Sequence, residues 1–134
     1  MKCVVDTNIL FSFFWKESFT RKLLLSKKFE LIAPKIALLE LERYYNEICK
    51  KVKINKKEFD KLLDELKKFV KFVEGKEYSS FTNEAIKISP DETDVDFFAL
   101  CMLNSCFLWS NDALLKDQNR IDVFSTEEIL DLLF

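Results

Sequence analysis

The chain contains one glycine and two prolines among its 134 residues, which leaves few positions for the tight turns of an all-β fold. Sandwiches and barrels connect many short strands through turns rich in glycine and proline. The hydrophobic fraction of 49% is too high for a disordered chain. A chain of this length is expected to fold around one core, so we expect a single domain spanning residues 1–134.

Short apolar segments rich in β-branched residues alternate with longer helical segments along the chain. Strands are predicted at residues 2–6, 29–34, 106–110 and 121–124, and residues 70–74 fit either a strand or the end of a helix. Helices are predicted at residues 7–15, 18–28, 34–51, 56–69, 79–88, 89–104, 111–117 and 125–134. This alternation indicates an α/β fold with a parallel sheet covered by helices on both faces.

Four acidic residues accompany these predicted elements. Asp6 ends the first strand, Asp112 follows the strand at 106–110, Asp94 lies in the first turns of a helix, and Glu40 lies within another helix. Open α/β sheets bind ligands in the crevice outside the carboxyl ends of their strands. We therefore expect the four carboxylates to meet at this edge. Each also has an ordinary structural interpretation, as a strand-end hydrogen-bonding group, a helix-start charge, a cap or an exposed side chain.

The glutamates of the predicted helix at 34–51 point in different directions. Glu40 lies on the side of Ala37 and Tyr44, whereas Glu42 is rotated by about 200° around the axis. One of the two must face inward if the helix packs on the sheet, and a buried carboxylate needs a cation or hydrogen bonds. The residues spaced to form one broad apolar face of this helix are Ile36, Leu39, Tyr44 and Ile48.

Three other acids compete with Asp94 for its place in the site: Asp91, Glu92 and Asp96. Asp96 is two positions further along the helix and faces away from Asp94. Asp91 lies before or at the helix start. We therefore predict that Asp94 faces the other acids and that its neighbours are outer charges.

Convergent carboxylates favour a hard divalent cation. Two carboxylates about 4 Å apart repel by roughly 4 kcal/mol at an effective dielectric constant of about 20. Magnesium prefers oxygen ligands and retains several waters. Such ions, singly or in pairs, can activate a bound water and hold the oxygens of a phosphodiester. The chain has no histidine, and this chemistry requires none.

The two halves of the chain carry opposite charge. Residues 16–76 hold 17 Lys and Arg against 10 Asp and Glu, whereas residues 77–134 hold 3 against 12. A basic half can meet phosphates and an acidic half can gather metal ions. The lysines predicted to guide phosphates are Lys50, Lys51, Lys53, Lys56 and Lys57. The alternative is that this stretch is a solvated helical face without a ligand.

The cysteines and the hydropathy pattern indicate a cytoplasmic protein. The four cysteines, at positions 3, 49, 101 and 106, form no C-x-x-C pair, so we expect buried, reduced thiols rather than a zinc site. No apolar run approaches the roughly 20 residues needed to cross a bilayer, and the start lacks the pattern of a signal peptide. We expect no membrane association.

Four sequence segments resemble the PIN-domain nucleases in order and approximate spacing: VVDTNIL, LLELERYY, DETDVDFFALCM and LWSNDALL. The resemblance covers almost the whole chain and implies a three-layer α/β/α sandwich with a central, mainly parallel sheet. It also implies an endoribonuclease that uses one or two Mg²⁺ or Mn²⁺ ions. The family's metal-binding and catalytic acids correspond to Asp6, Glu40, Asp94 and Asp112, with Ala99 five residues after Asp94. Polar positions that orient these acids correspond to Thr7, Asn8, Ser110 and Asn111.

The size of the chain is similar to that of small stand-alone prokaryotic or archaeal PIN domains of the VapC-toxin-like type. That resemblance implies an antitoxin partner and a homodimer. The main alternative is a PIN-fold module that binds RNA or protein without turnover. A phosphatase of the haloacid-dehalogenase type would need a second aspartate where this chain has Asn8.

Overall fold

The computed structural model describes residues 1–133, and its centre is a five-stranded sheet of strand order β3-β2-β1-β4-β5. The strands are β1 (Lys2–Val5), β2 (Glu30–Pro34), β3 (Val70–Val73), β4 (Phe107–Trp109) and β5 (Val123–Phe124). Every neighbouring pair runs parallel. The predicted parallel α/β sheet is therefore confirmed, and residues 70–73 form a strand rather than the end of a helix.

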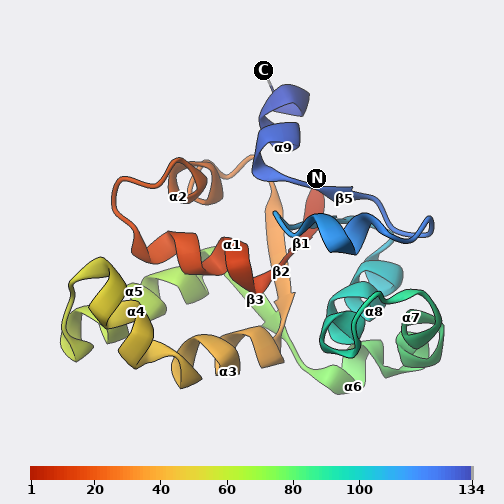
Figure 1. Ribbon diagram of the computed structural model, residues 1–134, viewed down its shortest axis with the longest axis horizontal. Coiled ribbons are helices and arrows are strands. Elements are labelled where there is room, and N and C mark those ends of the chain that lie inside the picture. Colours follow the sequence, from red (N-terminus) through yellow and green to blue (C-terminus); the bar gives the residue numbers. More distant parts are fainter. Residues whose placement is uncertain (134) are drawn as a thin grey trace.

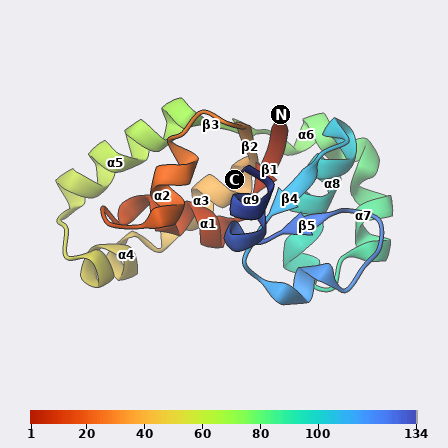
Figure 2. The same cartoon turned by 90° about the horizontal axis from the view of Figure 1, so that it is seen from above.

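The helices lie on both faces of this sheet. They are α1 (Thr7–Phe11), α2 (Phe19–Leu24), α3 (Lys35–Arg43), α4 (Tyr45–Val52), α5 (Lys56–Phe69), α6 (Gly75–Tyr78), α7 (Thr82–Ile88), α8 (Val95–Asn104) and α9 (Thr126–Leu133). Short 3₁₀ turns are η1 (Ser12–Phe14), η2 (Ser79–Phe81), η3 (Glu92–Asp94) and η4 (Ala113–Lys116). Helices α1 to α5 cover one side and α6 to α8 the other (Figures 1 and 2). The predicted three-layer arrangement is confirmed.

Several predicted helix boundaries were wrong. The segment 34–51 is not one helix, because Tyr44 leaves the helical conformation with φ −97° and ψ 19° and separates α3 from α4. The predicted helix at 7–15 is α-helical over Thr7–Phe11 and continues as the 3₁₀ turn η1, the one at 111–117 is the 3₁₀ turn η4, and the one at 79–88 is helical in the α form only from Thr82. The predicted last helix is confirmed up to Leu133, and its expected final residue, Phe134, lies outside the described residues.

The break at Tyr44 also changes the buried face of the two helices. The side chains of Ala37, Leu41 and Ile48 are buried. Leu39 and Tyr44, which were predicted to share the buried face, keep 49% and 42% of their surface exposed. Because α4 starts in a new direction, a face extrapolated from α3 does not continue into it.

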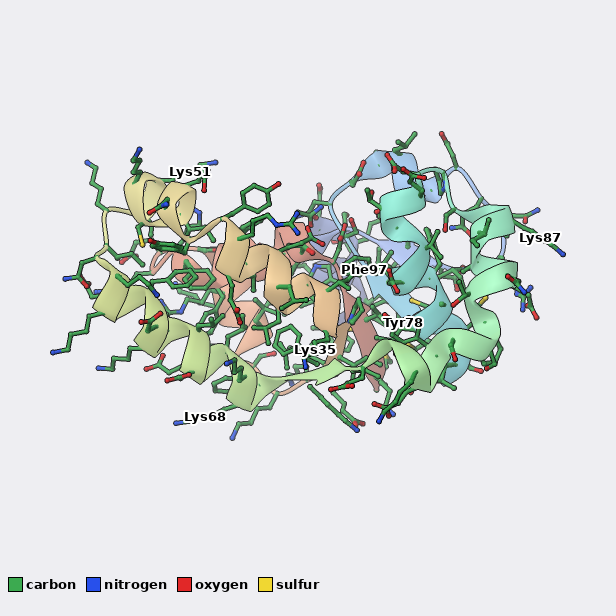
Figure 3. The ribbon with its side chains drawn as sticks, turned by 90° about the horizontal axis from the view of Figure 1, so that it is seen from below. Lys35, Lys51, Lys68, Tyr78, Lys87 and Phe97 are labelled. Atoms are coloured by element: carbon green, nitrogen blue, oxygen red, sulfur yellow. The ribbon has the colours of Figure 1, made fainter. Side chains whose placement is uncertain are left out.

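The core lies between the sheet and α8 on one side and between the sheet and the α1–α5 layer on the other. Residues 97–102 of α8 are buried all around the helix, as its apolar sequence predicts, and Phe97 points towards the middle of the molecule (Figure 3). On the opposite face, the rings of Phe14 and Phe59 stack with their centroids 5.0 Å apart. This contact joins η1 to α5.

The four cysteines are free thiols, as predicted, but Cys49 and Cys106 are only half-buried, not buried as expected. Cys3 and Cys101 are buried, and burial raises the pKa of both thiols. Both are therefore protonated and unreactive at neutral pH. Within residues 1–133, no helix is both long and apolar enough to cross a membrane.

Candidate active site

Asp6 stands at the carboxyl end of the central strand and begins the helix that follows. Its backbone N–H donates to the carbonyl oxygen of Trp109 at 2.9 Å, which extends the pairing of β1 with β4 by one residue. Its Oδ1 accepts a hydrogen bond from the backbone N–H of Thr7 at 2.8 Å, the usual geometry of an aspartate at a helix start. Asp6 is therefore fixed both by the sheet and by α1, and its side chain is 8% exposed.

The second carboxylate oxygen of Asp6 is held by side chains from both strand ends. The hydroxyl of Ser110 donates to Oδ2 at 2.6 Å, and the amide Nδ2 of Asn8 donates to the same oxygen at 3.2 Å. Ser110 Oγ in turn accepts a hydrogen bond from the backbone N–H of Asp112 at 3.1 Å. Because β1 and β4 are parallel neighbours, residues 104 positions apart form one hydrogen-bonded network at the sheet edge.

This network leaves Asp6 partly desolvated but not neutralised by a cation. Burial raises the pKa of the Asp6 carboxyl, the hydrogen bonds from Ser110 and Thr7 lower it, and the negative charge of Asp112 raises it again. The net shift is upward. Asp112 itself is exposed and caps η4, since its Oδ1 accepts from the backbone N–H of Leu114 at 3.1 Å.

Glu40 is the glutamate of α3 that turns inward. It is half-buried, whereas Glu42 is exposed. Burial raises the pKa of Glu40, the Asp6 carboxylate raises it further, and Arg43 and the Thr7 hydroxyl lower it. The Thr7 Oγ1 atom is buried and has no hydrogen-bond partner within residues 1–133.

Asp94 is the acid on which the charges of the other three act. It is the last residue of η3 and the residue before α8, and it is half-buried. Burial raises its pKa from 3.8 to about 6, and the charges of Asp6, Asp91, Asp112 and Glu40 all contribute in the same direction. Carboxylates from four separate segments therefore lie within range of one another's charge.

The hydrogen bonds of the neighbouring acids distinguish their roles from that of Asp94. Asp91 is exposed, and its Oδ1 accepts from the backbone N–H and the hydroxyl of Thr93 at 3.0 and 3.1 Å. Asp96 accepts a hydrogen bond of 2.7 Å from the hydroxyl of the buried Tyr78, which lies beside α8 in Figure 3. Glu92 is exposed. Asp91 is thus a turn cap and Asp96 an anchor for α6.

The chemistry of the donor set fits a hard divalent cation. All four side chains offer carboxylate oxygens, the ligands that Mg²⁺ and Mn²⁺ prefer, and their mutual repulsion is the kind of strain that a cation relieves. Across residues 1–133, no three side chains of the metal-ligating types lie close enough to enclose an ion. Mg²⁺ usually keeps several waters and takes only one or two carboxylates as direct ligands.

Not every residue predicted around the site points towards it. The amide oxygen of Asn111 accepts from the backbone N–H of Thr126 at 2.8 Å and so fixes the start of α9. The predicted phosphate-guiding lysines are exposed and span the end of α4 and the start of α5: Lys50, Lys51, Lys53, Lys56 and Lys57. Lys56 pairs with Asp60 at 3.0 Å and lies over the ring of Tyr45. Lys51 lines a hollow that also contains Asn8.

Sequence reasoning missed two features of this region. The first is the Tyr78–Asp96 hydrogen bond, which identifies Asp96 as an anchor; no local pattern announces a partner 18 residues away. The second is the hollow beside Asn8, into which the helix break brings Tyr44. The sequence contained one signal for this hollow. Trp15 follows Phe13 and Phe14, which are buried, but Trp15 itself had no predicted place in the core.

Comparisons with known proteins agree with this architecture. The sequence model of the PIN domain matches residues 4–129. Among solved structures, the complex of VapBC2 from Rickettsia felis with a DNA fragment from its promoter contains a similar chain: the TM-score is 0.64 and the identity 18%, over 93% of this chain and 98% of that one. No curated protein matches with significant sequence similarity. The structural match shows a shared fold, and the family match spans nearly the whole sequence, so the chain belongs to the PIN-domain family.

Proposed function

We propose that this chain is an endoribonuclease that hydrolyses RNA phosphodiester bonds with the help of Mg²⁺ or Mn²⁺. PIN domains are in general metal-dependent nucleases, and this chain belongs to that family. The observation that carries the proposal is the network at the sheet edge, where Ser110 donates to Asp6 Oδ2 at 2.6 Å and accepts from the backbone N–H of Asp112 at 3.1 Å, with the half-buried Glu40 and Asp94 within range of the Asp6 charge. Like charges are placed together in this way where a site uses them.

Asp6, Asp94, Asp112 and Glu40 would hold one or two ions. When bound, a divalent cation supplies an activated water and stabilises the negative charge that develops on the phosphate. Asp6 is the best-oriented ligand, since Ser110 and Asn8 hold its Oδ2 and Thr7 its Oδ1.

Glu40 is suited to a second task. Its half-buried carboxyl has a raised pKa, which brings it nearer to the working pH of a general base. Glu40 would therefore take up a proton from the attacking water at a carboxylate oxygen. Asp94 would share in positioning that water.

The proposal extends to a toxin of the VapC type. The similar solved chain comes from a VapBC2 complex, and the lengths of the two chains agree closely. We propose that an antitoxin protein blocks the acid centre, that the active form is a homodimer, and that it acts on RNA in the cytoplasm.

The test is RNA cleavage by the purified chain. With Mg²⁺ or Mn²⁺ we expect cleavage of single-stranded RNA, none in EDTA, and none with Asp6→Asn. Asp91→Asn is the matched control, because Asn caps a turn as well as Asp does and Asp91 is exposed. If Asp6→Asn cleaved as fast as the natural sequence, the proposed mechanism would be wrong.

A second candidate is a PIN-fold module that binds RNA or protein without cleaving it, and the observation that favours it is the run of exposed lysines at the end of α4 and the start of α5: Lys50, Lys51, Lys53, Lys56 and Lys57. A melting curve with and without Mn²⁺ distinguishes the two. A functional acid centre gains stability because the ion binds the folded state. No shift at millimolar Mn²⁺ would favour the binding module.

A further inference from the structure

A hollow of about 540 Å³ lies beside the acid centre, between the α1–η1 segment and α4. Asn8 lines this hollow, and its Nδ2 donates to Asp6 Oδ2 at 3.2 Å. Asn8 therefore belongs both to the wall of the hollow and to the hydrogen-bond network of Asp6. The volume is within the range of about 300–1,000 Å³ that is usual for small-ligand sites.

Aromatic side chains form much of the wall of this hollow. Trp15 and Tyr44 line it, and each keeps 42% of its surface exposed. Phe11 is half-buried and Ile48 is buried, and both line the hollow too. Both exposed aromatics stand where a helix ends: Trp15 follows η1, and Tyr44 separates α3 from α4. Exposed aromatic faces are the surfaces on which unpaired nucleobases stack.

A positively charged side chain, that of Lys51, lies at the same hollow. Lys51 lines the hollow and extends outward from α4 (Figure 3). None of the ion pairs within residues 1–133 involves Lys51. Glu47 is the acid in the wall, and within residues 1–133 it forms no ion pair with Lys51, which lies one helical turn away on α4. A lysine without an acidic partner is available to a phosphate.

We propose that this hollow binds a nucleobase of single-stranded RNA next to the bond that is cleaved. The base stacks on Trp15 and Tyr44, Lys51 contacts a phosphate, and Asn8 marks the boundary with the acid centre. This inference rests on the proposed function for its substrate. Double-stranded RNA keeps its bases paired and stacked inside the helix, so the hollow selects single strands.

The test measures binding without cleavage. The chain has two tryptophans, of which Trp109 is fully buried and Trp15 is exposed, so a base that stacks on Trp15 quenches the fluorescence of that residue alone. A single-stranded RNA octamer is titrated in EDTA. We expect saturable quenching, and none with Trp15→Phe, whose RNA affinity measured by anisotropy stays close to that of the natural sequence.

Matched variants assign the affinity to the hollow. Trp15→Ala and Tyr44→Ala each weaken octamer binding about 10-fold, as expected for the loss of one stacking contact. Phe19→Ala, which removes an aromatic of 56% exposure outside the hollow, does not weaken it. Lys51→Ala lowers the affinity and the slope of its salt dependence, whereas Lys87→Ala, on α7 at the far end of Figure 3, changes neither.

Each outcome separates this inference from the nuclease proposal. Quenching without cleavage in Mn²⁺ would retain the hollow as an RNA site and refute the nuclease. Cleavage with equal affinity of Trp15→Ala and Phe19→Ala would retain the nuclease and refute the hollow. Equal binding of a duplex would also refute it. A further result would refute the RNA site. If the octamer caused no quenching, and if sedimentation showed a dimer that Trp15→Ala converts to a monomer, a second copy of the chain would occupy the hollow.

Discussion

Replacement of Asp94 by Asn is expected to stabilise the protein at alkaline pH. Burial and the charges of Asp6, Asp91, Asp112 and Glu40 raise the pKa of Asp94 from 3.8 to about 6. The folded state therefore binds a proton more readily than the unfolded chain. A carboxyl group whose pKa is raised in the folded state contributes stability at pH values below its unfolded-state pKa. This contribution is lost as the pH rises through its folded-state pKa. The stability contributed by Asp94 thus falls between about pH 4 and pH 6.

The magnitude follows from the shift. A change from 3.8 to about 6 corresponds to about 3 kcal/mol if the group is fully shielded from solvent. Asp94 is only half-buried, and solvent screening reduces the figure to about 1–2 kcal/mol. For a domain of this size, that equals an increase in Tm of about 4–8 °C.

The assay is thermal and urea unfolding of both proteins in EDTA at pH 3.5 and pH 8. At pH 8, Asp94→Asn should be more stable by the stated amount; at pH 3.5, where the natural side chain is protonated in the folded state, the difference should nearly vanish. Asp91→Asn is the comparison: hydrogen bonds from Thr93 lower the pKa of Asp91, so its removal should give a smaller gain, limited to the repulsion that Asp91 exerts on Asp94. An equal gain at both pH values would refute the electrostatic reasoning.

Other perturbations test the contacts around the site. Ser110→Ala removes the 2.6 Å hydrogen bond to Asp6; RNA cleavage should slow at least about 10-fold and unfolding free energy fall by about 1–3 kcal/mol, whereas unchanged cleavage would mean that Asp6 needs no orientation. Tyr78→Phe leaves the Asp96 carboxylate without its 2.7 Å donor; urea unfolding should show a loss of about 2 kcal/mol with the cleavage rate retained, and slower cleavage would contradict an anchoring role. Millimolar Mn²⁺ should raise the Tm of the natural sequence but not of Asp6→Asn, and equal shifts would place the ion elsewhere.

The sheet could be predicted from the sequence because its strands are short, apolar and separated by helical segments. Parallel order at the centre follows from that alternation, and the structure pairs β1 with β4. This pairing accounts for the nearness of Asp6 to Ser110 and Asp112, since each stands just past the end of its strand. That part of the site depends only on local signals and sheet topology.

The rest depends on contacts that local patterns do not encode. The chain bends at Tyr44 within a sequence that is helical on both sides, so periodicity alone extends one helix through the break. The three acids around Asp94 cannot be told apart from it by residue type alone. The role of Asp96 follows from its hydrogen bond with Tyr78, which lies on another helix. Asn111 is adjacent to the acids in sequence but is used by α9.

The first strand to be synthesised occupies the middle of the sheet. β1 lies between β2 and β4, yet β4 begins only at Phe107. While the chain is still emerging from the ribosome, one edge of β1 has no partner, and unpaired edges invite association with other chains. Asp6 gains the hydroxyl of Ser110 only after residue 110 has been synthesised. Premature termination before β4 would therefore yield an aggregation-prone fragment without an assembled acid centre.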